Sequence, residues 1–325
     1  PKTVRFDFIH LFNTLEGIFE TEYMIETNKL AVASYGEALW DCIPDGLFLG
    51  GAPFNAAYHL ASLGVQSYPI TCVGDDLLGD QVFERAKSAG LNTDFIKRHE
   101  ILETGVALAK LDDQGNAEYD IRLPSAWDEI ELSAEEIALL SELDAIIYGS
   151  LVTRSELSRD TLETLLENFS GLKVCDINLR SPYDDLKRAI HFARLADIVK
   201  LNHDELYRVI AADPMDFALE GAMKECALLL GVDRLVVTLA GDGAAYCQDG
   251  EFATVESQSI EVADTIGAGD AFTSALVVGL VSGLGVDEVM ERANQLGAFV
   301  ATRSGGQPIY DSRMLLELSE AWAKS

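Results

Sequence analysis

From Ala31 onward, short β-rich runs alternate with longer helical stretches, and this alternation restricts the fold of the 325-residue chain more than any other feature. It predicts an α/β fold in which helices cover both faces of a mostly parallel sheet. We expect strands at residues 31–36, 67–73, 145–149, 173–177, 198–201 and 235–239. Apolar residues recur every three or four positions in the expected crossover helices, at residues 81–89, 157–168, 184–196 and 217–230. One large domain accounts for a chain of this length.

Two segments depart from the alternation. Residues 104–122 hold two strand-like runs on either side of the turn-like sequence DDQGN, which predicts an antiparallel hairpin. We therefore expect a small β lid outside the main sheet, formed from about residues 39–52 and 100–125. Residues 1–30 are aromatic-rich and precede the first convincing strand, so we assign them to an N-terminal extension of unknown role, and residues 31–325 to the main domain.

The charge balance narrows the classes of partner. The chain has 24 Lys and Arg against 54 Asp and Glu, a formal net charge of −30 at pH 7. Such an excess repels phosphate backbones and anionic lipids, which argues against nucleic-acid and membrane partners. No apolar run reaches the roughly 18 residues of a membrane span, and no secretory signal pattern opens the sequence. We therefore expect a cytoplasmic protein.

The most informative stretch is DTIGAGD at residues 264–270, which precedes the helix-like AFTSALVVGLVSGL. Small residues at Gly267, Ala268 and Gly269 let the backbone approach a ligand, and the N-terminus of the following helix favours an anion of phosphate size. On the first helical turn, the Asp270 carboxylate could accept a proton from a hydroxyl beside these donors. A glycine-rich helix start with Asp270 as an ordinary cap is the alternative interpretation.

A second stretch, GGAPFNAAYHLASLG at residues 50–64, follows the strand and turn ASYGEALWDCIPDG. Its paired glycines leave room for a ligand, Asn55 can donate and accept hydrogen bonds, and Asp41 can accept from two hydroxyls, as a polyol would require. Trp40 and Phe54 could pack against a sugar ring, although an aromatic residue beside a turn is more often part of the core. By itself this segment is weak evidence.

Together, the two stretches resemble the two signature motifs of the ribokinase-like (PfkB-type) carbohydrate kinases in order and separation. GEALWD, VGDDLLG, NHDE, TLAGDGAAY and ATRSGGQP also fall where that family would have them, so the resemblance covers about residues 31–320. It implies the ribokinase-like three-layer α/β/α fold with a small β lid, and a phosphotransferase with an alcohol group as acceptor. The chain has no GxxxxGK[ST] loop, so a helix N-terminus must bind the phosphate instead.

The resemblance also implies roles for individual residues. Asp270 resembles the catalytic base of the family, and the backbone of Gly267, Ala268 and Gly269 resembles its anion hole. The sugar-contacting positions of the family match Asp41, Gly51, Asn55 and Arg180. Arg180 belongs to CDINLR, which resembles a DxNxR segment of fructokinases; it would face phosphate or substrate, with a solvated turn as the alternative.

Further positions match the nucleotide and cation sites of the family. The residues on the ATP side are Asn202, Thr238, Gly241, Gly243 and Asn294. Asn202 and Glu205 match the NxxE motif, which organises Mg²⁺ and its waters around the phosphates, although from its residues alone NHDE is also typical of a polar loop entering a helix. A monovalent cation such as K⁺ would be held, mostly by backbone oxygens, at Asp264, Ile266, Val300, Arg303 and Gly305.

Among the sugar kinases, the resemblance is strongest to fructokinases, through GEALWDCIPDG, GGAPFNAAYHL, AWDEI and CDINLR. It implies transfer of the γ-phosphoryl group of ATP to fructose, which gives fructose 6-phosphate. Kinases of 2-keto-3-deoxygluconate and of ribose are the alternatives within the class, and a non-catalytic sugar-binding or regulatory protein is the alternative outside it. A dehydrogenase is disfavoured because no strand precedes a GxGxxG. Relatives commonly form homodimers through the lid hairpin, at residues 104–122 here.

Overall fold

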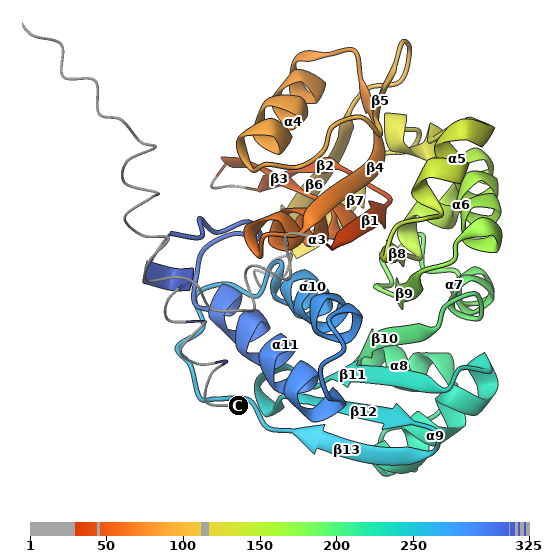
Figure 1. The fold of residues 1–325 in the computed structure, drawn as a ribbon, viewed down its shortest axis with the longest axis vertical. Helices are drawn as coiled ribbons and strands as arrows, with labels where there is room; N and C mark the ends of the chain where they lie inside the picture. Colours follow the sequence, from red (N-terminus) through yellow and green to blue (C-terminus); the bar gives the residue numbers. More distant parts are fainter. Residues whose placement is uncertain are drawn as a thin grey trace, which may run out of the picture.

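The structure is a computed structural model that describes residues 30–43, 46–111 and 117–311, together with 313–315, 318 and 322. Nine strands form the main sheet, in the order β13-β12-β11-β10-β9-β8-β1-β4-β5 (Figure 1). They are β1 (Ala31–Tyr35), β4 (Gln66–Gly74), β5 (Ile96–His99), β8 (Ala145–Gly149), β9 (Leu172–Asp176), β10 (Ile198–Asn202), β11 (Arg234–Thr238), β12 (Ala244–Gln248) and β13 (Glu251–Val255). Of the expected extension at residues 1–30, residues 1–29 lie outside the described residues.

The main sheet is parallel from β5 to β11, and β12 and β13 add an antiparallel edge. This confirms the mostly parallel sheet. All six expected strands are present, whereas β5, β12 and β13 were not predicted as strands. The sequences of β5 (IKRH) and β13 (EFATV) explain why these two strands were omitted. Both are short, carry charges and are only partly buried, so their apolar periodicity is weak.

Two hydrophobic cores lie on opposite faces of the sheet, which therefore forms the middle of three layers. One core holds residues of α3 (Ala52–Ser62), α10 (Ala268–Val281) and α11 (Val286–Ala301). The other holds residues of α5 (Ala134–Leu140), α6 (Glu156–Asn168), α7 (Leu186–Ala193), α8 (His203–Val209) and α9 (Leu219–Leu230). Neighbouring residues of one strand alternate between the cores: Val32 belongs to the first and Ala33 to the second.

Helix α10 is apolar on nearly all sides because it is buried by the sheet, α3 and α11. Its close approach to α11 depends on Gly279, since a Cβ there would lie 2.8 Å from Cγ2 of Val289. Outside the three layers, α4 (Leu77–Ser88) follows β4 and packs its buried Val82 and Ala86 into a smaller cluster with α3. The packing of α10 places its N-terminus, which carries the GAGD sequence, beside α3.

A second sheet forms the lid, with strands in the order β3-β2-β6-β7. Its members are β2 (Leu39–Ile43), β3 (Gly46–Gly50), β6 (Gly105–Leu111) and β7 (Ala117–Ile121). β6 and β7 pair antiparallel, as the hairpin prediction requires, and β2 pairs with β3 antiparallel and with β6 parallel. The turn DDQGN at residues 112–116 lies outside the described residues.

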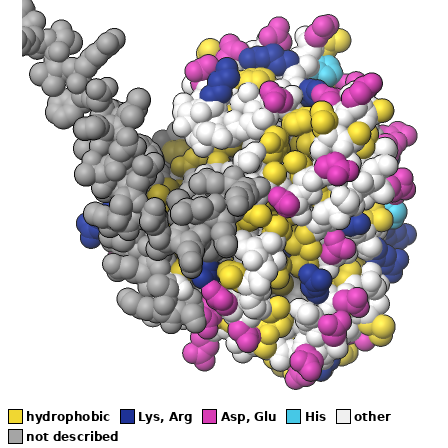
Figure 2. All heavy atoms as spheres, viewed as in Figure 1, with side chains coloured by type: hydrophobic (Ala, Val, Ile, Leu, Met, Phe, Trp, Pro, Cys, Tyr) yellow, Lys and Arg dark blue, Asp and Glu magenta, His cyan; other side chains and the backbone are white. Residues whose placement is uncertain are grey.

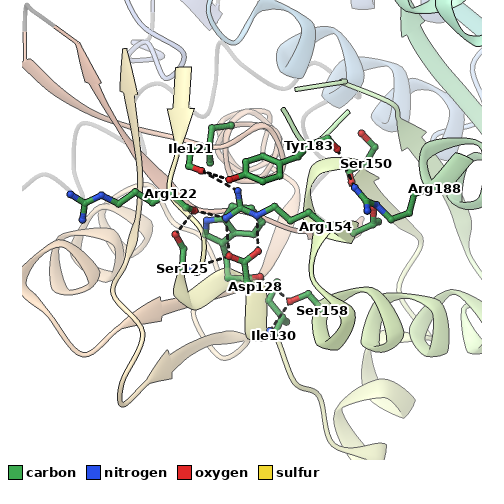
Figure 3. A network of polar contacts seen from close by, with 12 residues as sticks. Ile121, Arg122, Ser125, Asp128, Ile130, Ser150, Arg154, Ser158, Tyr183 and Arg188 are labelled. Atoms are coloured by element: carbon green, nitrogen blue, oxygen red, sulfur yellow. Dashed lines mark hydrogen bonds and ion pairs between the residues drawn. The ribbon is translucent and has the colours of Figure 1, made fainter. Parts of the chain in front are cut away.

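A buried ion pair joins the end of lid strand β7 to the body (Figure 3). The Arg154 guanidinium donates to both carboxylate oxygens of Asp128, at 2.7 and 2.8 Å, and to the carbonyl oxygen of Ile121. It also lies over the rings of Trp127 and Tyr183, at 3.9 and 4.4 Å from their centroids. The Tyr183 hydroxyl donates to the same Ile121 oxygen at 3.0 Å. These contacts fix the position at which the lid strand returns to the body.

Acidic side chains are distributed over the described part of the face shown in Figure 2, in keeping with the net charge of −30. Lys and Arg side chains occur among them singly or in small groups. Within the residues that the structure describes, none of the helices combines the length and the apolar character needed to cross a membrane.

Candidate active site

The N-terminus of α10 carries the GAGD sequence at its predicted position on a turn that becomes a helix. Gly267 is the N-cap residue and adopts a left-handed conformation with φ 77°. A Cβ at this position would lie 2.5 Å from Cα of Gly306, so both the dihedral angle and the packing require glycine. Ala268 donates its N–H to the carbonyl of Thr265 at 3.3 Å, whereas Gly269 lies in the first turn, where N–H groups have no acceptor within the helix.

The Asp270 carboxylate lies on this first turn and is bonded to α3. Nδ2 of Asn55 donates to Oδ2 of Asp270 at 2.8 Å, across 215 residues of sequence. Desolvation by the surrounding protein raises the pKa of Asp270 to about 6; Asp176 raises it further, whereas the Asn55 bond, Lys200 and Arg180 lower it. A carboxyl group with such a pKa is ionised at neutral pH and remains basic enough to accept a proton.

Asp41 lies on lid strand β2, in the electrostatic neighbourhood of Asp270. Burial raises the pKa of Asp41 to about 6, while Arg180 lowers it and Asp270 raises it. Gly50 makes room for this carboxylate, since a Cβ there would lie 2.3 Å from Oδ2 of Asp41. The structure therefore brings Asp41, Asn55, Arg180 and Asp270, which are widely separated in the sequence, into one polar cluster, joined by the Asn55–Asp270 hydrogen bond and by electrostatic interactions.

Glu37, just after β1, interacts electrostatically with Asp270 and Arg180 and is a member of this cluster that we did not single out. It is only 3% exposed; its Oε1 accepts from the N–H of Ala52 at 3.3 Å, and its Oε2 has no hydrogen-bond partner among the described residues. Burial raises its pKa to about 7. Gly51 packs against it, because a Cβ at Gly51 would lie 2.3 Å from the Glu37 carbonyl oxygen. The available signal was a carboxylate in GEALWD, directly after a buried strand.

A second residue missed by the sequence reasoning is Lys200, on β10. Its Nζ lies 2.6 Å from Oδ2 of Asp176, and both side chains are buried. A Cβ built on Gly269 would lie 3.5 Å from the same Nζ. The lysine therefore places a buried positive charge beside the expected anion hole, partly balanced by Asp176. The signal was a lysine inside the otherwise apolar strand IVKLN.

The NxxE residues form a helix cap. Asn202 is the N-cap of α8, its Oδ1 accepts from the N–H of Glu205 at 2.9 Å, and Oε2 of Glu205 accepts from the N–H of Asn202 at 2.9 Å. Oε1 of Glu205 accepts from the N–H of Leu179 at 2.7 Å, which ties the segment before Arg180 to this cap. Burial raises the pKa of Glu205.

This donor set bears on the expected magnesium site. Each oxygen of Glu205 already accepts a backbone N–H, which leaves it one further lone pair, and the side chain is buried. Within the described part of the chain, three or more His, Cys, Asp or Glu residues are nowhere grouped to hold a metal ion. The residues therefore fit a Mg²⁺ ion held mainly by ATP phosphates and water, the coordination that Mg²⁺ commonly adopts beside nucleotides.

The other residues expected at the nucleotide follow β11. Thr238 is paired with Asn202 across β10 and β11, so the two side chains belong to the same carboxyl edge of the sheet. Gly241 lies in a short 3₁₀ turn, Ala240–Asp242. Gly243 has φ 103°, and a Cβ there would lie 2.0 Å from the carbonyl oxygen of Val255. The turn is thus held against the end of β13.

Asn294 projects from α11 and donates to the carbonyl of Glu256 at 3.0 Å. It lines a groove of about 1280 Å³ between α11 and residues 254–263. This volume is large enough for a small-molecule ligand of nucleotide size.

The two segments expected around a monovalent cation lie side by side. Oδ1 of Asp264 accepts from the N–H of Ile266 and Oδ2 from the N–H of Gly305, each at 3.0 Å. The carbonyl of Val300 accepts from the N–H of Arg303 at 2.9 Å, and the Arg303 side chain is exposed. Any cation there would therefore be bound by the backbone oxygens left free between these turns, with Asp264 holding the turns together.

A carboxylate on the first turn of a buried helix, with the lid-strand carboxylate of Asp41 in its electrostatic neighbourhood, is the arrangement expected of a PfkB-type carbohydrate kinase. The family model described as pfkB family carbohydrate kinase matches residues 24–313, and the chain belongs to this family. The predicted ribokinase-like fold and carbohydrate kinase class are thereby confirmed.

Two curated relatives are similar over most of the chain. A fructokinase of Escherichia coli is 30% identical over 305 residues, which cover 87% of this chain and 96% of the relative. A probable fructokinase of Arabidopsis thaliana is 28% identical over 313 residues, which cover 86% and 93%.

Two solved structures share the fold. An uncharacterised sugar kinase from Pyrococcus horikoshii superposes with a TM-score of 0.76 at 25% identity, covering 90% of this chain and 98% of its own. A fructokinase from Vibrio cholerae O395 with fructose, ADP and calcium ion bound has a TM-score of 0.76 at 21% identity, covering 86% and 95%. At this identity the second structure supports the fold alone.

Proposed function

We propose that the protein transfers the γ-phosphoryl group of ATP to a primary hydroxyl of fructose, producing fructose 6-phosphate and ADP. One observation carries the proposal: the Asp270 carboxylate lies at the N-terminus of α10, bonded to Asn55 and within electrostatic range of Asp41. This proximity supports the assignment of Asp270 as the proton acceptor, of the helix-end N–H groups as hydrogen-bond donors to phosphate and of Asp41 and Asn55 as partners of the sugar hydroxyls.

In this mechanism Asp41 and Asn55 bind the sugar, and Asp270 accepts the proton of the reacting hydroxyl. The hydroxyl oxygen forms a bond to the γ-phosphorus while the bond from that phosphorus to the β,γ-bridging oxygen breaks, so ADP leaves with the electron pair. The first-turn N–H groups of α10 and the buried Lys200 ammonium stabilise the negative charge on the transferring group. Holding both reactants in line supplies much of the acceleration.

ATP, Mg²⁺ and K⁺ are the proposed cofactors. Mg²⁺ would be held by the nucleotide phosphates and by waters near Asn202 and Glu205, where it would neutralise phosphate charge. Support comes from a sugar kinase structure from Pyrococcus horikoshii in complex with ATP, and from a putative ribokinase II of E. coli in complex with ATP and Mg²⁺. K⁺ would bind the backbone oxygens of the turns that Asp264 joins.

The choice of sugar is tested by a substrate panel. We expect fructose to give the highest kcat/KM in a coupled assay of ADP release, compared with ribose, 2-keto-3-deoxygluconate and adenosine at saturating MgATP. The fructokinases among the relatives support this expectation. If fructose gave the weakest signal, the assignment of fructose as the substrate would be wrong. If no acceptor were phosphorylated although calorimetry detected sugar binding, a non-catalytic sugar-binding protein would be favoured.

The pKa of Asp270 predicts the pH dependence of turnover. The base accepts a proton only when ionised, so kcat/KM for the sugar should rise as pH increases through about 6 and level off above it. Asp41, with a pKa raised to about 6, contributes to the same limb because its ionised form is the stronger acceptor for sugar hydroxyls. Initial rates between pH 5 and pH 9 at constant ionic strength measure this limb, and a flat profile down to pH 5 would contradict the assignment.

Two further expectations remain proposals. The acidic composition and the family resemblance support a cytoplasmic enzyme. The resemblance also supports a homodimer through the lid hairpin at residues 104–122, which would cover a sheet edge otherwise open to unwanted pairing.

A further inference from the structure

Gln307 lies in the segment after α11, and the sequence reasoning gave it no role. Its Nε2 donates to Oδ1 of Asn55 at 2.9 Å, and Nδ2 of Asn55 donates to Oδ2 of Asp270 at 2.8 Å. Gly306 allows this close approach, because a Cβ there would lie 3.1 Å from Nδ2 of Asn55. A chain of two hydrogen bonds thus connects Gln307 to the proposed base.

The chemistry of the groups sets the direction of this chain. An ionised carboxylate only accepts hydrogen bonds, so the amide group that faces Asp270 must be the NH₂ of Asn55. The carbonyl oxygen of Asn55 then faces Gln307, which must present its own NH₂. Asn55 is only 5% exposed, so its orientation depends on protein partners more than on water.

The backbone that carries Gln307 is held against α3. The Tyr58 hydroxyl donates to the carbonyl of Pro308 at 2.7 Å, and Nδ1 of His59 lies 2.8 Å from the Tyr310 hydroxyl. Burial lowers the pKa of His59 to about 3, so its ring is neutral at physiological pH. Because Asn55 belongs to the same helix, α3 keeps Gln307 at a constant distance from the amide that it contacts.

We propose that Gln307 is a positioning residue for phosphoryl transfer, which holds the Asn55 amide in the orientation that donates to Asp270. The inference rests on the proposed function of Asp270 as the base. With the amide so oriented, Asn55 donates to Oδ2 of Asp270 and stabilises the ionised form of the carboxylate. With the amide reversed, an oxygen would face Asp270, and the protonated form of the carboxyl would be favoured.

The other charged groups around Asp270 come from elements that a substitution at position 307 leaves unchanged. They are Asp176 on β9, Arg180 in the following loop, Lys200 on β10, Glu37 after β1 and Asp41 on β2. A change in the pH profile of a Gln307 variant is therefore attributed to the Asn55 amide or to a charge introduced at position 307 itself.

Two substitutions at Gln307 test the inference. Gln307→Glu places an acceptor opposite Asn55 and turns the amide, so we expect the acid limb of kcat/KM to move up by about one pH unit, which lowers kcat/KM at pH 6 by about fivefold. Gln307→Met keeps the size of the side chain without the donor, and should lower kcat by about fivefold with a smaller shift. KM for MgATP should change less than about twofold in both, because ATP does not contact Gln307 in the proposal.

Controls separate positioning from structural damage and from simple repulsion. Gln81, exposed on α4, receives the same two substitutions, which should leave the pH profile unchanged. In an Asn55→Ala background, Gln307→Glu should shift the acid limb by less than about 0.3 units, because the amide is gone. A full shift of the acid limb in that background would show that the carboxylate introduced at position 307 acts on Asp270 directly, and would overturn the inference.

If Gln307→Glu and Gln307→Met lowered kcat/KM equally and to the same extent at every pH, the inference would also be overturned, since Gln307 would then have a structural role. If Gln307→Glu does not fold, as judged by circular dichroism, the pH profile of Gln307→Met decides, and the absence of any shift there counts against us. Full activity of Asp270→Asn would instead refute the proposed function, whatever the Gln307 variants show.

Discussion

Asp270→Asn should reduce kcat with the acceptor sugar by about 10²-fold or more, the usual range for loss of a general base. The substitution preserves the size of the side chain and removes its ability to take the hydroxyl proton. Nucleotide binding should persist, because the N–H groups at the start of α10 belong to the backbone and remain in place. We expect the Kd for MgATP, measured by calorimetry, to stay within about threefold of the unmodified protein.

The matched control for this variant is Asp160→Asn on α6, where the aspartate side chain is 62% exposed and the helix covers the face of the sheet opposite α10. It should retain full activity. Near-normal turnover of Asp270→Asn, under conditions where both variants are folded, would exclude Asp270 as the base. Residual activity that falls less steeply below pH 6 would agree with the assignment, since only Asp41, whose pKa Asp270 would no longer raise, would remain to titrate.

Arg154→Met should destabilise the protein by about 3–5 kcal/mol, because it leaves the Asp128 carboxylate buried without its partner. The side chains of Arg154 and Asp128 are only 1% and 3% exposed. The substitution also removes the contacts of the guanidinium with the Trp127 and Tyr183 rings and with the Ile121 carbonyl. Urea unfolding followed by tryptophan fluorescence measures the change in the free energy of unfolding.

Arg159→Met provides the comparison, since Arg159 pairs with Asp160 at 3.5 Å on the surface of α6. Loss of such an exposed pair should cost no more than about 1 kcal/mol. The loss of stability in Arg154→Lys should fall between those of the two Met variants, because lysine retains the charge but cannot form the bidentate bond to Asp128. Equal stability of the Arg154→Met and Arg159→Met variants would show that the buried pair contributes little to the junction between the lid and the body.

The fold could be predicted largely from the sequence because its strongest signals are local. The strands of the buried parallel sheet are continuous apolar runs, and the crossover helices carry the apolar period of a helix. The edge strands β5 and β13 were missed for the same reason, since partly solvated strands lack such runs. The flanks of the lid hairpin were found because alternating residues border a turn sequence.

The candidate site was predicted only in part. Asp270, Asn55 and Asp41 belong to recognisable motifs, and the structure brings them into one polar cluster. Glu37 and Lys200 were overlooked because each is one polar residue at the end of, or within, an apolar run, where sequence alone does not show what it faces. Glu205 was expected at the magnesium ion, and its hydrogen bonds to the backbone of Asn202 and Leu179 became visible only in the structure.

The sequence by itself determined the α/β architecture, because burial periodicity is a local pattern of a few residues. The kinase class came from the resemblance of two short motifs to the signatures of a known family. Only the tertiary structure decided how the carboxylates titrate and which amide faces which acceptor. The hydrogen bonds of Asn55 to Asp270 and to Gln307 span 215 and 252 residues. A pKa depends on the groups that folding brings within a few ångströms, and no local pattern records that proximity.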